Sequence, residues 1–316
     1  MKKTAFEKRV KRRITGREQP FFAASAPGLT RSCFRELLSL GVPKEKLHAV
    51  PGGIEFQARP DTAMQISLYA RIPVRILMRA EKFKASSFTQ LEQKASKIDW
   101  PLFLPRNASL HINVTTHRSR LYHTDAVAER LSRVIREKLD NEDGFSAPKP
   151  IEVIIMARAK DDHFTLSVDT TGIPLYKRGI KTMTTPAPLR ENIAAAMLAW
   201  AGYAPGDVLI DPMCGSGTFS LEAAMIHAAV PPGLFRSFAF EQMPGFSSKA
   251  ISHLKKKALE QINQSDPADI LASDTNKTAL DALRQNMAGH VFTRGIQTRQ
   301  SDFFSIRPPH GQTGVI

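Results

Sequence analysis

The 316-residue sequence has few cysteines and no long hydrophobic run, and both absences limit what the protein does. Two cysteines, Cys33 and Cys214, cannot form a disulfide framework or a four-thiolate zinc site. No stretch approaches the roughly 18 apolar residues of a membrane-spanning helix, and no apolar segment follows the basic N-terminus as in a secretory signal. We therefore expect a cytoplasmic protein with no membrane partner. We also expect no metal, because His111, His117 and His123 are spaced six residues apart with no cysteine nearby, which is typical of structural or surface histidines.

Acidic residues are scarce in the first part of the chain. Residues 1–140 hold 27 Lys and Arg against 13 Asp and Glu, whereas residues 141–316 hold 17 of each, so the first part carries the whole net charge of +14. Residues 1–18 alone hold eight basic side chains, and we expect them to form a basic, disordered tail. Because the excess continues into folded sequence, it favours a nucleic-acid partner. For the tail alone, a segment that only aids solubility is an equal alternative.

Apolar periodicity predicts two α+β units before residue 173. Residues 19–84 follow the order strand, helix, strand, strand, helix, strand, which is that of a ferredoxin-like unit. Residues 85–172 form a second unit that ends in a β-hairpin. Its helix over residues 125–139 places five apolar side chains on one face, namely Val127, Leu131, Val134, Ile135 and Leu139. A Thr/Pro-containing linker over residues 173–188 follows.

Residues 189–316 alternate short apolar strands with helices. The strands are expected at 208–210, 269–273 and 296–300, and a fourth begins at residue 314. This alternation is typical of a doubly wound parallel sheet, so we predict an α/β fold for this part.

A glycine-containing turn, "DPMCGSGT" (211–218), joins the first of these strands to the next helix. Gly215 and Gly217 allow a ligand to approach the backbone, and the start of a helix offers unpaired amides to a carboxylate or phosphate. A phosphate-binding loop is disfavoured because no Gly-Lys-Ser/Thr follows. A nicotinamide fingerprint is also disfavoured, because the third glycine and the later acid are lacking.

Three acids stand at the carboxyl ends of successive strands: Asp211, Asp274 and Asp302. Such positions line one crevice of a parallel sheet, and carboxylates suit hydroxyl and amine groups, so together the three favour a ribose-bearing ligand. The alternative for Asp274 and Asp302 is helix capping.

The turn resembles the cofactor motif of S-adenosylmethionine-dependent methyltransferases that act on exocyclic amines. With "SRLYHTDAVAERLSRVI" (119–135), "LYKRGIK" (175–181) and "APLRENIAAAML" (187–198), nearly the whole chain is similar to the bacterial 23S rRNA guanine-N2 methyltransferases that carry a THUMP domain. The resemblance implies that residues 19–84 are ferredoxin-like, that residues 85–172 are a THUMP RNA-binding domain, and that residues 189–316 are an incomplete Rossmann-like methyltransferase domain.

The resemblance also implies which residues bind. Asp274 would take the ribose hydroxyls and Asp302 the adenine amine, and the cofactor set is Asp211, Pro212, Cys214, Gly215, Gly217, Thr218, Asp274 and Asp302. The expected RNA contacts are Lys11, Arg12, Arg13, Arg118, Arg130, Arg133, Arg136, Lys177 and Arg178, for which an ordinary solvated surface is the alternative. Arg190 and Asn192 help to close the pocket, or else they pack or face solvent. Phe303 stacks on adenine or belongs to the core.

The family's catalytic Asn/Asp-Pro-Pro-Tyr/Phe motif ends the fourth strand, and we expect it beyond Ile316. "RPPH" (307–310) precedes that strand and is not a substitute, because arginine offers donors where an amine needs an acceptor. We therefore expect a truncated chain that is inactive alone. Two alternatives stay open: a non-catalytic RNA-binding module and a DNA adenine-N6 methylase, the second disfavoured by the THUMP-like half.

Overall fold

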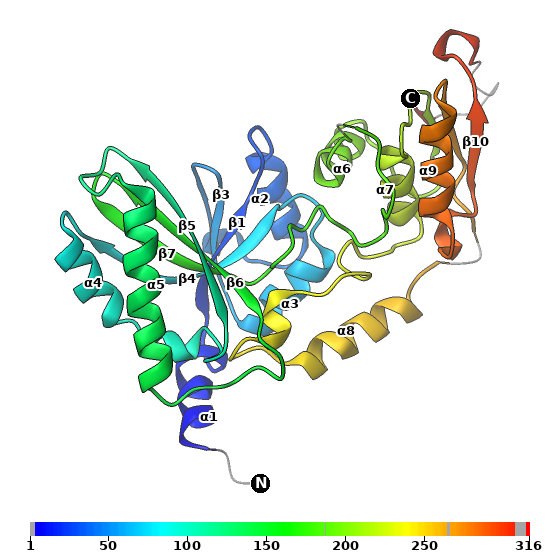
Figure 1. Ribbon diagram of the computed structural model, residues 1–316. Helices are drawn as coiled ribbons and strands as arrows, with labels where there is room; N and C mark the ends of the chain where they lie inside the picture. Colours follow the sequence, from blue (N-terminus) through cyan, green and yellow to red (C-terminus); the bar gives the residue numbers. More distant parts are fainter. Residues whose placement is uncertain (1–3, 187, 264–265, 307–313) are drawn as a thin grey trace.

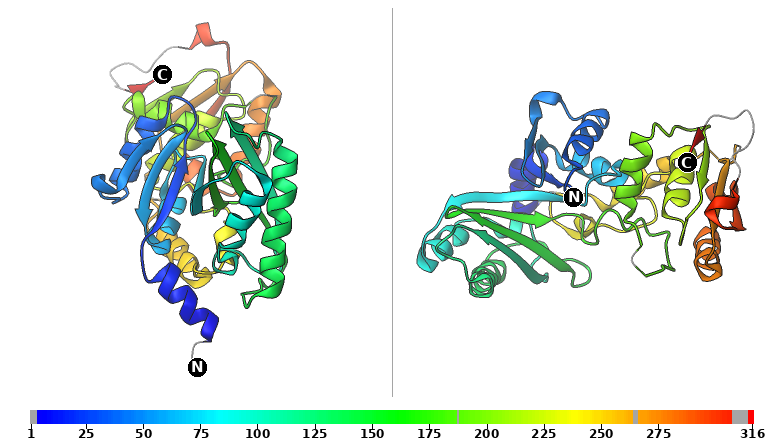
Figure 2. Two further views of the ribbon diagram at one scale, coloured as in Figure 1. Left: turned by 90° about the vertical axis from the view of Figure 1, so that its left-hand side faces the viewer. Right: turned by 90° about the horizontal axis from the view of Figure 1, so that it is seen from above.

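The computed structural model describes residues 4–186, 188–263, 266–306 and 314–316. It has two lobes, each built on one β-sheet, and the view from above shows them side by side (Figures 1 and 2). The α-helices are α1 (Ala5–Val10), α2 (Thr30–Ser39), α3 (Pro60–Tyr69), α4 (Phe88–Ser96), α5 (Thr124–Asn141), α6 (Glu191–Trp200), α7 (Thr218–His227), α8 (Ser248–Glu260) and α9 (Lys277–Met287). Within the described ranges, none of the helices is long and apolar enough to cross a bilayer.

The strands of the N-terminal lobe are β1 (Gln19–Ala24), β2 (Leu47–Val50), β3 (Gly53–Ala58), β4 (Arg75–Lys84), β5 (Ser109–His117), β6 (Glu152–Lys160) and β7 (His163–Asp169). They form one sheet in the order β2-β3-β1-β4-β7-β6-β5. The strands of the two predicted units are therefore joined, through antiparallel pairing of β4 with β7. One hydrophobic core serves both, with Phe21 from the first and Trp100 from the second.

Helix α5 confirms the periodicity argument. Its buried residues are the five that the sequence placed on one face: Val127, Leu131, Val134, Ile135 and Leu139. The helix packs against β5 and carries the chain to β6, which pairs parallel with β5. The expected hairpin joins β6 to β7 through Asp161 and Asp162, whose φ angles of 52° and 63° fit a two-residue hairpin turn.

The prediction of a disordered tail is wrong for the described part of residues 1–18. Helix α1 begins with a capping box between Thr4 and Glu7, and a π-helical turn, Lys11–Thr15, continues it. Val10 and Ile14 are buried against the rest of the lobe. Because Phe6, Val10 and Ile14 are four residues apart, they form an apolar stripe that outweighs the repulsion of the surrounding basic side chains.

The C-terminal lobe has the predicted parallel sheet. Its strands β8 (Val208–Asp211), β9 (Ile270–Asp274), β10 (Ile296–Gln300) and β11 (Gly314–Val315) lie in the order β10-β9-β8-β11. Helix α7 packs against β8 and β9, and α9 packs against β9 and β10. The order reverses at β8, so the carboxyl end of this strand is where a doubly wound sheet binds its ligand. The "RPPH" tetrapeptide lies outside the described residues.

A buried charge cluster ties the lobes together. Glu222 of α7 is 1% exposed and accepts hydrogen bonds from Arg71 at 2.7 Å and from Arg178 at 3.3 Å. Burial alone would raise the pKa of Glu222, but the two guanidiniums outweigh it and the pKa is lowered. Arg178 also donates to the Arg71 carbonyl at 2.8 Å. The segment expected as a linker is thus packed between the lobes.

Candidate functional site

The glycine turn lies between β8 and α7, and both glycines have left-handed backbones. Gly215 has φ 53°, and Gly217, the residue before the first turn of α7, has φ 80°. A Cβ at Gly217 would overlap Leu283 of α9, so the turn packs tightly on its underside. A Cβ at Gly215 would meet only Thr185 Oγ1, at 3.8 Å. The backbone at Gly215 is therefore accessible to a ligand.

Asp274 fixes this turn to the neighbouring strand. One of its carboxylate oxygens accepts the Gly215 N–H at 2.9 Å, and the other accepts the Asn276 N–H at 2.8 Å. The Cys214 N–H also donates to the Ser273 carbonyl at 2.9 Å. The half-buried carboxylate of Asp274 thus lies against the open glycine, as a pocket for a hydroxylated ligand requires.

Asp211 belongs to the base of the same site. It is 6% exposed and accepts the Ser220 hydroxyl at 2.6 Å. Burial raises its pKa, the bonds from Ser220 lower it, and the charge of Asp274 raises it further, which shows that the two acids are close. Because its carboxylate is bound to Ser220 at the start of α7, Asp211 holds this helix against the glycine turn.

Asp302 lies at the same edge of the sheet but faces solvent. Its side chain accepts the Phe304 N–H at 2.9 Å at the start of a short 3-10 turn, as the capping alternative predicted. The preceding Ser301 N–H donates to the Asp274 carbonyl at 3.2 Å, so the chain at Asp302 is next to the site. Phe303 is 44% exposed, so the alternative that assigned it to the core is wrong.

The other cofactor candidates also surround the turn. Cys214 is buried, and burial together with Asp211 and Asp274 raises the pKa of its thiol to about 12, so it is not a nucleophile. Thr218 Oγ1 accepts a hydrogen bond from Lys181 at 2.8 Å. Pro212 lines an apolar cavity of about 370 Å³ that includes Phe303.

Two residues expected near the pocket have different roles. Asn192 is buried and donates to the Ile72 carbonyl at 3.2 Å, so it packs α6 on the N-terminal lobe. Arg190 is exposed and lies over the Tyr176 ring.

Most of the arginines expected to contact RNA have protein partners. Arg130 and Arg133 both pair with Glu92, at 2.8 and 2.7 Å. Arg136 donates to the carbonyls of Arg106 and Ala108. All three arginines therefore have partners within the N-terminal lobe, while the side chain of Arg133 stays exposed, and their contact with RNA stays a prediction. Arg13 pairs with Asp99, and Arg118 with Asp161.

Arg178 is not a surface residue. It is 4% exposed within the Glu222 cluster, so the expectation that it contacts RNA is wrong. Its neighbour Lys177 is exposed, as are Lys11 and Arg12. In the described part of the chain, no group of three or more His, Cys, Asp or Glu is placed to hold a metal ion.

Sequence reasoning missed the residues that hold the segment 173–188, which joins the two lobes, over the site. Asn286 of α9 accepts the backbone N–H groups of Thr182 and Met183, at 2.9 and 3.0 Å. Lys181 reaches the first turn of α7, and Thr185 lies above Gly215. The only available signal was the density of polar side chains in this segment, which is equally typical of a surface loop.

The site fits a nucleoside-type ligand with an amino-acid tail. The backbone at Gly215 is open, Asp274 stands beside it, and the Ser216 hydroxyl in the turn is 2% exposed with no hydrogen-bond partner among the described residues. A buried hydroxyl without a partner is costly, which suits a position that a ligand completes. The fold and the turn together define a Rossmann-like methyltransferase domain.

Comparisons with known proteins agree. Residues 178–316 match the family described as "RMKL-like, methyltransferase domain", residues 85–169 the THUMP domain, and residues 20–77 the "RlmL ferredoxin-like domain". A relative from Synechocystis sp., "Putative RNA methyltransferase slr0064", is 30% identical over 303 residues, which cover 94% of this chain and 78% of the relative. The "Ribosomal RNA large subunit methyltransferase K/L" of Methylococcus capsulatus is 30% identical over 308 residues, or 94% of this chain, but this chain spans only 41% of that relative's length.

A solved structure shares the fold. The crystal structure of "SMU.472, a putative methyltransferase complexed with SAH" superposes with a TM-score of 0.85 at 26% identity, over 95% of this chain and 79% of that one. The chain belongs to the family of THUMP-containing RNA methyltransferases with an RMKL-like methyltransferase domain, whose methyl donor is S-adenosylmethionine.

Proposed function

We propose that this protein methylates the N2 amine of guanine in 23S rRNA, in the cytoplasm. The main support is the open glycine turn with Asp274 bonded to Gly215, in a domain that follows a THUMP domain. The name of the Methylococcus relative, a ribosomal RNA large subunit methyltransferase, supports the choice of RNA.

We assign the donor pocket to the residues around the turn. Asp274 would accept hydrogen bonds from the ribose hydroxyls, because its oxygens keep lone pairs beyond the bonds to Gly215 and Asn276. The first turn of α7 would face the carboxylate of the methionine part, since helix N-termini favour negative charge. Asp302, exposed at the next strand end, would accept from the adenine amine.

Bound S-adenosylmethionine supplies an electrophilic methyl group, which the guanine amine accepts with loss of one proton, leaving S-adenosylhomocysteine. The chain's own residues would orient the donor rather than act on the proton. Neither Asp211 nor Asp274 needs to serve as a base, since the methylated amine can release its proton to water.

The acceptor is tested by giving the full-length gene product that carries this sequence labelled S-adenosylmethionine with either protein-free rRNA or duplex DNA. The labelled nucleoside is then identified by chromatography and mass spectrometry. We expect N2-methylguanosine from the large-subunit rRNA. Label in N6-methyladenine of DNA would assign the protein to the other class of amine methylases, and rRNA binding without any transfer would favour the non-catalytic module.

A further inference from the structure

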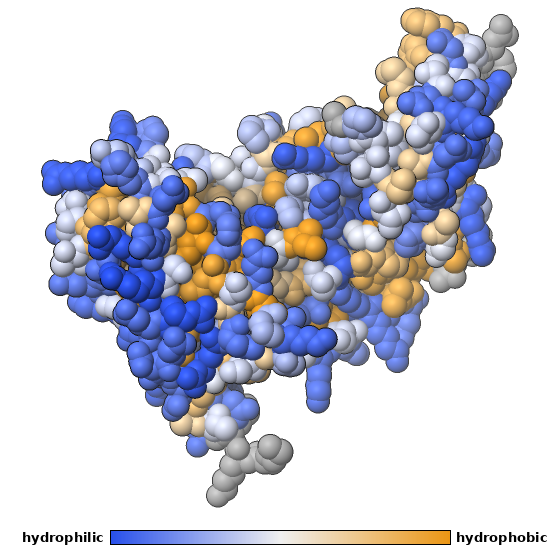
Figure 3. Space-filling model, viewed as in Figure 1, coloured by the Kyte–Doolittle hydropathy of each residue, from blue (hydrophilic) through white to orange (hydrophobic). Residues whose placement is uncertain are grey.

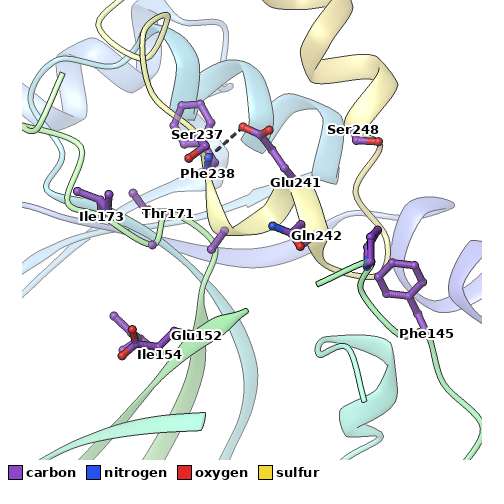
Figure 4. A pocket seen from close by; sticks show the side chains of 13 residues that line it. Phe145, Glu152, Ile154, Thr171, Ile173, Ser237, Phe238, Glu241, Gln242 and Ser248 are labelled. Atoms are coloured by element: carbon purple, nitrogen blue, oxygen red, sulfur yellow. Dashed lines mark hydrogen bonds between the residues drawn. The ribbon is translucent and has the colours of Figure 1, made fainter. Parts of the chain in front are cut away.

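A groove on the N-terminal lobe extends to the segment that joins the two lobes. Its central cavity, of about 820 Å³, is lined by side chains of β6 and of the segment around Phe238 and Ser248, which lie on opposite sides of it (Figure 4). Apolar side chains gather in the hollow middle of this face of the molecule (Figure 3). Through Ile173 and Ser237 the central cavity adjoins a second one of about 400 Å³, which we name the linker cavity.

The linker cavity is connected to helix α7, which begins at the glycine turn, through Lys181. It is lined by Lys177, Lys181, Thr184, Glu191 and Arg236 among others. Lys181 Nζ donates to Thr218 Oγ1 in the first turn of α7, at 2.8 Å. Thr218 and Glu222 are one turn apart on the helix and share a face, so this cavity lies on the side of α7 that meets the N-terminal lobe.

Positive charge exceeds negative charge in the lining of this cavity, where Lys177, Arg178, Lys181 and Arg236 face Glu191 as the one acid that the structure describes there. Among the described residues, Lys177, Lys181 and Arg236 have no carboxylate oxygen within 4 Å, whereas Arg178 pairs with Glu222. Arg236 is buried and donates instead to backbone carbonyls, including Pro174 O and Thr171 O. Cations that are partly desolvated without a counter-ion destabilise a protein, so an anion is expected to bind at this position.

The pKa shifts of Lys181 and Glu191 agree with an excess of positive charge in the linker cavity. Burial lowers the pKa of Lys181, the nearby Glu191 opposes this, and Lys177 lowers it further. The acid that lines the cavity, Glu191, has its own pKa raised by burial, which weakens its value as a counter-ion. By contrast, Arg130 and Arg133, on the surface where RNA was expected, share Glu92.

We infer that the linker cavity holds a phosphodiester of the RNA strand beside the nucleotide that is methylated, with Lys177 and Lys181 as its ligands. This inference rests on the proposed function. Two ammonium groups with unbonded hydrogens suit the two non-bridging oxygens of a phosphate. The cavity adjoins the central groove at one end and the donor helix at the other, so a strand that lies in the groove would reach the donor site there.

The test compares charge-removing variants in RNA binding. Fluorescence anisotropy with a labelled single-stranded RNA of about 12 nucleotides gives the affinity as a function of salt for the wild-type chain and for Lys177→Gln/Lys181→Gln. Loss of one phosphate contact lowers the slope of log K against log salt by about 0.7 for single strands. We expect that decrease, with affinity roughly tenfold lower at low salt. The single Lys177→Gln variant, which changes an exposed residue without a hydrogen bond to the donor helix, should keep its S-adenosylmethionine affinity in calorimetry.

Three further variants keep the result interpretable. Lys256→Gln/Lys257→Gln removes the same charge from exposed lysines of α8 and should leave the slope unaltered. Lys177→Arg/Lys181→Arg keeps the charge and should keep the slope. The single Lys177→Gln variant changes an exposed residue, so it is expected to fold and must by itself lower the slope.

The inference is overturned by an unchanged slope in Lys177→Gln/Lys181→Gln, or by an equal loss in the α8 pair. It is also overturned if S-adenosylmethionine affinity falls while the RNA slope stays, because Lys181 would then bind the donor's carboxylate. These outcomes leave the proposed function intact. If the wild-type chain binds no RNA, both this inference and the proposed function are wrong.

Discussion

Replacing three glycines one at a time by alanine separates backbone strain, packing and ligand access at the glycine turn. Gly217 and Gly202 have nearly the same backbone, with φ of 80° and 79°, but differ in their surroundings. A Cβ at Gly217 would overlap the Cδ1 atom of the fully buried Leu283 and would lie 3.1 Å from its Cγ atom. A Cβ at Gly202 would meet no atom within 4 Å. Both variants carry the left-handed strain of roughly 1–2 kcal/mol. Overpacking adds about 1–3 kcal/mol for Gly217→Ala alone.

The free energy of unfolding is measured by urea denaturation with far-UV circular dichroism. We expect Gly217→Ala to be less stable than Gly202→Ala by about 1–3 kcal/mol, because effects on the unfolded chain are the same for both. Gly215→Ala, whose Cβ meets only Thr185 Oγ1 at 3.8 Å, should match Gly202→Ala in stability. It should nevertheless bind S-adenosylmethionine about tenfold or more weakly, because the added alanine methyl group takes the space through which the ligand approaches the backbone. Equal stabilities for Gly217→Ala and Gly202→Ala would refute the packing argument.

Two further predictions concern buried groups. Glu222→Gln should lower the free energy of unfolding by about 3–5 kcal/mol, because Arg71 and Arg178 lose their counter-ion. Since the folded-state pKa of Glu222 is lowered, its contribution is present above the unfolded value of about 4.3 and is lost as the pH falls through the folded value, so the two denaturation curves should converge at acid pH. Cys214, with a thiol pKa of about 12, should react with iodoacetamide at neutral pH only after unfolding, and rapid labelling of the native protein in mass spectrometry would contradict its burial.

Local patterns predicted the elements well and the long-range pairings poorly. The five apolar residues of α5 and the strands of the C-terminal sheet follow from spacing alone, because burial of one face repeats at the period of the element. The pairing of β4 with β7, which joins the two N-terminal units, depends on segments far apart in the chain and leaves no local signal.

The same distinction explains the errors in the site. Arg178 reads as a surface cation within a basic stretch, and only its partner Glu222 in α7 makes it a buried residue. The helical start of the chain was visible in the spacing of Phe6, Val10 and Ile14, but the surrounding charge obscured it. The carboxylates at the strand ends were predicted as a group. Asp302 also caps a turn, because a strand end begins the next element, and its bond to adenine stays a prediction.

The central claim is that the carboxylate bonded to Gly215 holds a methyl donor. Calorimetric titration of S-adenosylmethionine into the wild-type chain, Asp274→Ala and the exposed control Asp281→Ala tests it directly. We predict binding by the wild type and by the control, and loss of measurable binding in Asp274→Ala while its circular dichroism spectrum stays unchanged. Equal affinity in all three proteins would contradict the account.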